Sequence, residues 1–222
     1  MLTIILVESS LELIPKSMHN HPSVTSYSKK FKKNPAITLL DNSWHFAAMK
    51  GLENEIKRGR PDIIHLTLLS LCTTPAFFEN KFKIFIHTIK NQVITINNNT
   101  RLPKSYHRFQ GLMEKLFLTN KIESEHEILM EIEDSSISQL ISKIKPSQII
   151  GLTTMGKNIT FGKLVKQMDE NSCILIGGFQ KGHFNKETQK IIEKSFSIND
   201  LSLEAHLVAS RLIYEYEKTI FI

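Results

Sequence analysis

Short apolar runs alternate with amphipathic stretches along the last third of the chain. Three runs of aliphatic and β-branched residues predict buried strands, at Gln148–Thr153, Ile174–Ile176 and Phe196–Ile198. Apolar residues at helical spacing predict helices around Phe161–Met168, around Lys186–Glu193 and from Ser202 onward. This alternation predicts an α/β fold whose sheet is largely parallel and covered by helices on both faces.

The first two thirds of the chain add further elements of both kinds. Leu2–Val7 is predicted to be a central strand, and Ile128–Ile132 is a further short strand. Phe82–Ile89 and Val93–Ile96 are predicted to form a hairpin that projects from the main sheet or lies at its edge. Predicted helices run from a cap at residues 41–43 to about Ile56, from Pro103 to about Phe117, and over Ser136–Lys145. The run Ile63–Leu71 fits a buried strand or a short helix, and the stretch from Pro15 to Lys33 is rich in loop formers.

The composition is that of an ordinary globular protein, and we expect one domain over residues 1–222. The chain is 41% hydrophobic and 23% charged, and it has no apolar run of about 18 residues that would span a membrane. Its start lacks the basic region of a signal peptide. Cys72 and Cys173 each lie in an apolar run, as reduced core residues of a cytosolic protein would. The net charge of +6 favours an anionic partner, nucleic acid first.

The loops that follow the last three predicted strands are the strongest indication of a ligand site. Gly177, Gly178 and Gly182 lie in the second loop, but their spacing matches neither a dinucleotide fingerprint nor a phosphate loop. The carboxyl ends of parallel strands meet at one sheet edge, where ligands bind. The three loops, Thr153–Gly156, Gly177–Gly182 and Ile198–Leu203, therefore suit a nucleoside or an adenosyl cofactor better than a metal. The histidines show no metal-ligand spacing, and no G-x-S-x-G hydrolase motif occurs.

A set of basic residues in the middle of the chain suits phosphate contacts. Arg60 and Asp62 flank a proline that restrains their backbone, and the further cations Arg101, Lys104 and Arg108 follow. If the helix starts at Pro103, Lys104 and Arg108 share one helical face, and the row fits an RNA backbone. Tyr106 or Phe109 could stack on a base, with core packing the better expectation for Phe109. A further cluster of lysines, Lys29, Lys30, Lys32 and Lys33, is most simply interpreted as a solvent-exposed surface.

Three long motifs resemble one enzyme family. They are RPDIIHLTLLSL (Arg60–Leu71), TRLPKSYHRFQGLMEKLF (Thr100–Phe117) and ILIGGFQKGHF (Ile174–Phe184), joined by LLDNSWHFAAM (Leu39–Met49). Together they resemble the Nep/Emg-type pseudouridine methyltransferases of ribosome biogenesis, members of the SPOUT superfamily. The resemblance covers nearly the whole chain, whose compact length is similar to that of the archaeal members.

The resemblance implies a SPOUT-type α/β knot with a carboxyl-terminal trefoil, and the predicted β-hairpin would be a small extension of it. It implies a homodimer that uses S-adenosylmethionine to methylate N1 of a pseudouridine in a small-subunit ribosomal RNA hairpin, and the reduced cysteines favour a cytoplasmic location. RNA-binding residues carried over by motif are Arg60, Asp62, Arg101, Lys104 and Arg108. Asp62 and Arg60 are also the expected catalytic residues: Asp62 would take the proton, and Arg60 would hold the adjacent phosphate or restrain Asp62. Expected cofactor-binding residues are Leu152, Thr153, Thr154, Gly156, Ile176, Gly177, Gly178, Phe179, Gly182, Ile198, Leu201 and Leu203.

The chain departs from the family pattern at three places. Lys104 stands where many members have arginine, Gln180 stands where a proline is expected, and the third loop lacks a Tyr-Pro pair. Two other interpretations stay open beside the enzyme. The chain could be an RNA-binding assembly factor whose methyl transfer is secondary, and Asp62 could serve only as a structural ion pair with Arg60. Methylation of a ribose hydroxyl, as in other SPOUT enzymes, fits these motifs less well.

Overall fold

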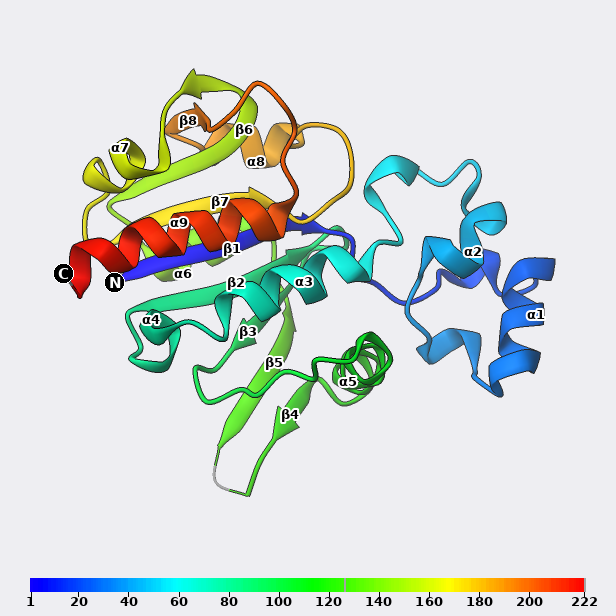
Figure 1. Ribbon diagram of the computed structural model, residues 1–222. Helices are drawn as coiled ribbons and strands as arrows, with labels where there is room; N and C mark the ends of the chain where they lie inside the picture. The colour runs from blue at the N-terminus through cyan, green and yellow to red at the C-terminus, as the bar shows by residue number, and fades with distance from the viewer. Residues whose placement is uncertain (126, 222) are drawn as a thin grey trace.

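A computed structural model of the protein describes residues 1–125 and 127–221, and within these residues eight strands form one sheet (Figure 1). The strand order is β4–β5–β3–β2–β1–β7–β6–β8. The strands are β1 (Leu2–Ser9), β2 (Phe82–Thr88), β3 (Gln92–Ile96), β4 (Lys121–Glu123), β5 (Ile128–Asp134), β6 (Gln148–Asn158), β7 (Ser172–Gly177) and β8 (Lys194–Ser197).

The helices are α1 (Pro22–Phe31), α2 (Asn42–Met49), α3 (Pro61–Leu71), α4 (Pro75–Phe78), α5 (Tyr106–Thr119), α6 (Ile137–Ile144), α7 (Phe161–Lys166), α8 (Lys186–Ile191) and α9 (Ala205–Ile220). Each of these helices in the described chain is too short or too polar to cross a membrane.

The sheet has a parallel half and an antiparallel half. β2, β1, β7, β6 and β8 run parallel, whereas β3, β5 and β4 pair antiparallel. β1 lies between β2 and β7, and all of its residues are buried, which explains its nearly continuous apolar sequence. The predictions of a central first strand and a largely parallel carboxyl-terminal region are confirmed.

Helices cover both faces of the sheet, as the alternation of elements predicts. Side chains alternate along β1, so that Ile4 and Leu6 join the core beneath α3 and α9, whereas Ile5 and Val7 join the core beneath α6. Figure 1 shows α3 and α9 in front of the sheet and α6 behind it. Burial raises the pKa of each thiol, Cys72 and Cys173, to about 12, so both behave as inert core residues.

Residues 10–60 form a small unit beside the sheet that the sequence only partly predicts. The stretch expected as loop contains α1, which starts at Pro22 after His21, whose Nδ1 accepts a hydrogen bond from Ser23 N at 3.2 Å. α1 and α2 pack around a cluster of their own, composed of Ile14, Met18, Val24, Leu40 and Met49. Figure 1 shows this unit to one side of the main sheet.

A buried ion pair connects the two chain segments that link this unit to the sheet. Arg58 donates from Nε and Nη2 to the two carboxylate oxygens of Glu12, at 2.7 and 2.6 Å. The two side chains are only 5% and 3% exposed. Because both charges are desolvated, each depends on the other for its stability in the folded protein.

One ambiguous prediction is resolved and two predicted helix boundaries are wrong. The run Ile63–Leu71, expected as a buried strand or a short helix, belongs to the helix α3, with Pro61 at the first helical position. α2 stops at Met49 rather than near Ile56, and Gly51 follows at φ +83°. The helix expected from Pro103 begins at Tyr106 instead.

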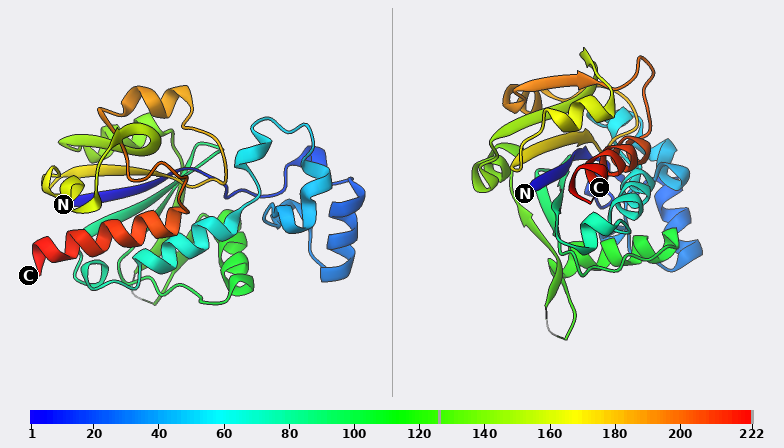
Figure 2. Two further views of the ribbon diagram at one scale, coloured as in Figure 1. Left: turned by 45° about the horizontal axis from the view of Figure 1, so that its top comes forward. Right: turned by 60° about the vertical axis from the view of Figure 1, so that its left-hand side comes forward.

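The predicted position of the hairpin is also wrong. β2 and β3 form a hairpin, but β3 continues the sheet to β5 rather than edging it. The pair that extends at the sheet edge is β4–β5 (Figure 2).

Candidate functional site

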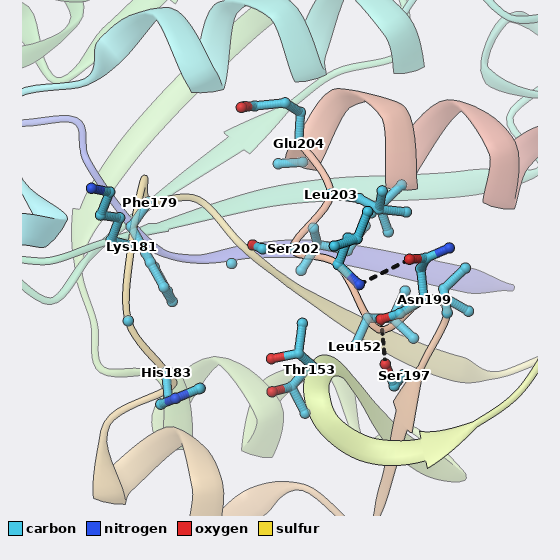
Figure 3. Close-up of a pocket in the computed structure, with 18 of the residues that line it drawn as sticks. Leu152, Thr153, Phe179, Lys181, His183, Ser197, Asn199, Ser202, Leu203 and Glu204 are labelled. Atoms are coloured by element: carbon cyan, nitrogen blue, oxygen red, sulfur yellow. Dashed lines mark hydrogen bonds between the residues drawn. The ribbon is translucent and has the colours of Figure 1, made fainter.

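One pocket lies where β7 and β8 end, beside the middle of β6, which lies between them in the sheet. It is lined by Leu152–Thr154 of β6, by the loop after β7, by the loop between β8 and α9, and by the start of α9. Figure 3 shows Phe179 and Lys181 on one side of this pocket and Asn199 and Leu203 on the other. The expected juxtaposition is therefore present for the loops after β7 and β8, and a stretch inside β6 takes the place of the third strand end.

All but two of the residues expected in the cofactor site line this pocket. The lining includes Leu152, Thr153, Thr154, Ile176, Gly177, Phe179, Gly182, Ile198, Leu201 and Leu203. The first of the three segments differs from its prediction, because β6 continues through the expected loop to Asn158 and pairs again with β8 after an irregularity. The third loop is held by its own hydrogen bonds, from Ser197 Oγ to Asn199 O at 2.9 Å and from Leu201 N to Asn199 Oδ1 at 2.8 Å (Figure 3).

The two exceptions, Gly156 and Gly178, allow close packing of the protein chain instead. A Cβ at Gly156 would lie 2.5 Å from backbone atoms of Phe196. A Cβ at Gly178 would overlap Ser9 and come within 2.9 Å of Ile64 Cδ1. Gly178 also bonds through its backbone to Val7 and Ser10, at 2.8 Å each. Both glycines support the pocket from behind and are absent from its lining.

Replacing Gly156 by alanine should destabilise the protein by about 1–3 kcal/mol, because the backbone of β8 must move to admit a methyl group. Gly111 in α5 offers a matched control, since a Cβ there meets no atom within 4 Å. The same substitution at Gly111 should stabilise the protein by about 0.5–1 kcal/mol through helix propensity. Urea unfolding of the two variants checks this, and equal effects at both positions would contradict it.

A buried lysine holds the loop after β7 from outside the pocket. Lys57 Nζ donates to Glu8 Oε2 at 2.5 Å and to the carbonyl oxygen of His183, and it lies 4.3 Å from the centroid of the Phe179 ring. Glu8 accepts a further hydrogen bond from Asn185 N at 2.8 Å. The pair therefore fixes both ends of a loop that lines the pocket.

Arg60 and Asp62 form a bidentate ion pair at the start of α3. Nε and Nη2 of Arg60 donate to the two carboxylate oxygens of Asp62, at 2.8 and 2.7 Å. The hydrogen bonds to Asp62 raise the pKa of Arg60, and the carboxylates of Glu204 and Asp41 raise it further. Glu204 lines the pocket, so Arg60 lies within electrostatic reach of the pocket edge.

The other three predicted cations are exposed, but they do not form the predicted helical face. Lys104 precedes α5, so it does not share a face of that helix with Arg108. His65 in α3 contacts the carbonyl oxygen of Pro103 through Nε2 at 2.8 Å, which holds this segment against the helix. The Arg101 guanidinium lies 4.8 Å from the ring of Phe78 in α4, beyond the far end of α3 from Arg60.

The two aromatic residues suggested for base stacking are structural. The hydroxyl of Tyr106 donates to Asp41 Oδ2 at 2.6 Å, and burial raises the pKa of Tyr106. Phe109 is fully buried, and its ring stacks on His65 with centroids 4.5 Å apart. Core packing, the alternative weighed for Phe109, is confirmed.

Several residues of the site were missed from the sequence. Lys181, His183, Asn199, Ser202 and Glu204 also line the pocket. Single polar residues in loops do not form a recognisable motif. The only feature of the sequence that could have indicated these residues was their position in the loops after β7 and β8. Within residues 1–125 and 127–221, no three His, Cys, Asp or Glu side chains gather where they could hold a metal ion.

The protein has close relatives in sequence and in structure. The family model described as EMG1/NEP1 methyltransferase matches residues 4–217. A "Ribosomal RNA small subunit methyltransferase Nep1" from Saccharolobus solfataricus is 42% identical over 212 residues, which cover 95% of this chain and 94% of that protein. The protein of the same name from Staphylothermus marinus is 39% identical, and the match covers 96% of this chain and 93% of that protein.

The crystal structure of Archaeoglobus fulgidus Nep1 bound to S-adenosylhomocysteine superposes with a TM-score of 0.88. It is 35% identical, and the match covers 98% of each chain. The resemblance inferred from the motifs is thereby confirmed, together with the expected fold class, while the threading of the carboxyl-terminal knot stays a prediction. The chain belongs to the EMG1/NEP1 methyltransferase family.

Proposed function

We propose that this protein transfers a methyl group from S-adenosylmethionine to N1 of a pseudouridine in a hairpin of small-subunit ribosomal RNA, as a step in ribosome biogenesis. The observation that carries the proposal is the pocket between β6 and the loops after β7 and β8, with the Arg60–Asp62 pair within electrostatic reach of its edge. Support also comes from relatives named as ribosomal RNA small subunit methyltransferases and from one crystallised with S-adenosylhomocysteine, the donor after methyl loss.

The residues of the pocket fit such a donor. Aliphatic side chains of Leu152, Ile176, Ile198 and Val208 line it and suit a planar base, while backbone groups of the loops are available for hydrogen bonds. Lys181 and Glu204 bring opposite charges to the lining, as the zwitterionic amino-acid end requires. When bound, the sulfonium supplies an activated methyl group, so the chain's main task is to hold the acceptor in line with it.

The Arg60–Asp62 pair has the geometry to position the target base. An ionised carboxylate has about four acceptor positions, and Arg60 occupies two of them. The Asp62 side chain is 37% exposed, so it retains acceptors for the N1–H of pseudouridine and for the proton as it leaves. The guanidinium keeps three further N–H donors, which suit a neighbouring phosphate. Pairing with Arg60 therefore orients Asp62 and is compatible with a catalytic role.

The RNA itself would follow the exposed cations Arg101, Lys104 and Arg108 alongside α3. α3 has 11 residues and is about 16 Å long, so phosphate contacts from Arg60 to Arg101 suit an RNA stem rather than a single nucleotide. Such contacts make affinity depend on salt. A hairpin loop suits the site because its target base is already unpaired.

We further propose a cytoplasmic homodimer, with the carboxyl-terminal segment threaded as a knot. The exposed apolar side chains Leu66 on α3 and Tyr214 on α9 lie in the helical layer in front of the sheet and are candidates for burial between two copies. Analytical ultracentrifugation tests the dimer, and a single monomeric species at all concentrations would contradict it.

Replacing Lys57 by methionine should weaken S-adenosylhomocysteine binding about tenfold, or about 1.4 kcal/mol. The loop after β7 loses the contacts of Lys57 with His183 and Phe179, and it must be ordered on binding instead. Isothermal titration calorimetry measures the change, with the exposed Lys50→Met as control.

The paired variant Glu8→Gln, Lys57→Met avoids a stranded buried charge and should show the same loss of affinity. Unchanged affinity in a folded paired variant would contradict a role for Lys57 in holding the loop.

The experiment that tests the proposed function is transfer of labelled methyl from S-adenosylmethionine to two synthetic hairpins. One carries uridine and the other pseudouridine at the same loop position. We expect label on the pseudouridine hairpin alone. Binding to both hairpins with label on neither would overturn methyl transfer and favour an RNA-binding assembly factor.

A further inference from the structure

An aromatic and basic surface lies on the α1–α2 unit, outside the pocket. We define the aromatic–lysine patch as Tyr27, Lys30, Phe31 and Trp44. Phe31 and Trp44 are 41% and 42% exposed, and Lys30 Nζ lies 5.2 and 4.9 Å from the centroids of their rings. Lys29 and Lys32 are exposed beside it in sequence, whereas Lys33 is paired with Glu114 at 2.7 Å.

The rings of the patch are held in place by one another. Tyr27 lies 4.6 Å from Phe31 and 5.5 Å from Trp44, and Phe31 meets Trp44 edge to face at 5.2 Å. Tyr27 is almost fully buried and also packs on His45 at 4.9 Å. The two exposed rings therefore rest on a rigid base and lose little freedom when a partner covers them.

The patch is connected to the residues proposed to position the target base. α2 starts beside Arg60, because Asn42 N donates to Gly59 O at 2.8 Å. Asp41 caps α2 and accepts a hydrogen bond from the hydroxyl of Tyr106 in α5. The charge of Asp41 also raises the pKa of Arg60, although the hydrogen bonds from Arg60 to Asp62 have the largest effect on that pKa. The start of the helix that carries Trp44 therefore adjoins both Arg60 and the start of α5.

We propose that the aromatic–lysine patch binds unpaired nucleotides of the RNA that flank the target hairpin. Bases stack on Phe31 and Trp44, and Lys29, Lys30 and Lys32 contact the phosphates between them. Stacking on aromatic side chains combined with cations is the common mode of binding single-stranded nucleic acid, and it accepts any base. The surplus of lysines favours RNA over an apolar protein partner. The inference rests on the proposed function for the identity of the nucleic acid.

Trp44 is the only tryptophan of the chain, so its fluorescence reports on the patch alone. We would titrate the full-length protein with a single-stranded oligouridylate and, separately, with an abasic oligonucleotide of equal length and charge. We expect oligouridylate to quench the fluorescence, with an affinity that falls as salt rises. The abasic strand should leave the fluorescence unchanged. Absence of quenching by oligouridylate, or equal quenching by both strands, would overturn stacking at the patch.

Two variants locate the site. Phe31→Ala should weaken oligouridylate binding about tenfold, as removal of one stacking ring does. Lys30→Gln should weaken it a few-fold and reduce its dependence on salt. Lys218→Gln is the matched control, because Lys218 Nζ lies 5.4 Å from the ring of Tyr214 on the distant α9. Equal losses in Lys30→Gln and Lys218→Gln would indicate general electrostatics and overturn the patch.

This readout separates the patch from the proposed function. Label on the pseudouridine hairpin without quenching by oligouridylate would leave the enzyme intact and remove the patch. Quenching without label on either hairpin would retain the patch as a nucleic-acid site and remove the methyl transfer.

Discussion

Replacing Asp62 by asparagine should lower the rate of methyl transfer to the pseudouridine hairpin by a factor of about 10²–10⁴, the usual contribution of a positioned acid–base group. The amide has the same shape and stays beside Arg60, but it loses the charge that holds N1–H and takes up its proton. RNA affinity should change only a few-fold, because the phosphate-binding cations remain. Single-turnover transfer and filter binding on the same preparations measure both quantities.

The matched control is Glu123→Gln on β4, which also turns a carboxylate in an ion pair into an amide. Glu123 pairs with Lys121 at 2.7 Å, and both side chains are about half exposed, far along the sheet from the pocket. The control should leave transfer and binding unchanged. If Asp62→Asn lowers transfer and RNA binding by the same factor, Asp62 has only a structural role.

Replacing Arg58 by methionine should reduce the free energy of unfolding by about 3–5 kcal/mol, because Glu12 is left buried and charged without its partner. Replacing both residues by apolar side chains, as in Arg58→Met, Glu12→Leu, should recover most of the loss. Urea unfolding at one fixed protein concentration gives both values and their coupling.

An exposed ion pair provides the comparison. Lys143 and Glu133 meet at 2.6 Å with side chains 58% and 46% exposed, so Lys143→Met should cost less than about 1 kcal/mol. Equal losses for the single and double variants at Arg58 would show that the buried pair is not energetically coupled.

The carboxyl-terminal half of the fold was predictable because each strand and helix there has its own local signal. The strands are short apolar runs, and the helices that follow carry apolar residues at helical spacing. The run Ile63–Leu71 was ambiguous because a fully apolar segment has no period, and Pro61 at the first helical position was the signal that favoured a helix. α1 was missed because it is short, mostly polar and preceded by loop-forming residues, and it buries only Val24 and Tyr27.

The loops that form the site could be predicted from the sequence, but the contacts that support these loops could not. The neighbouring positions of β6, β7 and β8 follow from the order of elements, which explains why most of the expected cofactor residues line one pocket. A glycine needed for a ligand and a glycine needed for a neighbouring strand look alike in sequence, so the sequence did not show that Gly156 and Gly178 pack against the protein chain. The contact between Lys57 and Glu8 joins residues 49 positions apart, and nothing local marks it.

The central position of β1 has a consequence for how the chain is made. β1 is synthesised first, but its neighbours β2 and β7 begin only at residues 82 and 172. During translation one edge of this apolar strand stays unpaired until most of the protein has left the ribosome, and such edges are prone to aggregate. Pairing of distant segments is also intrinsically slow. We therefore expect the free edge of β1 to be the most aggregation-prone part of the nascent chain until β7 pairs with it.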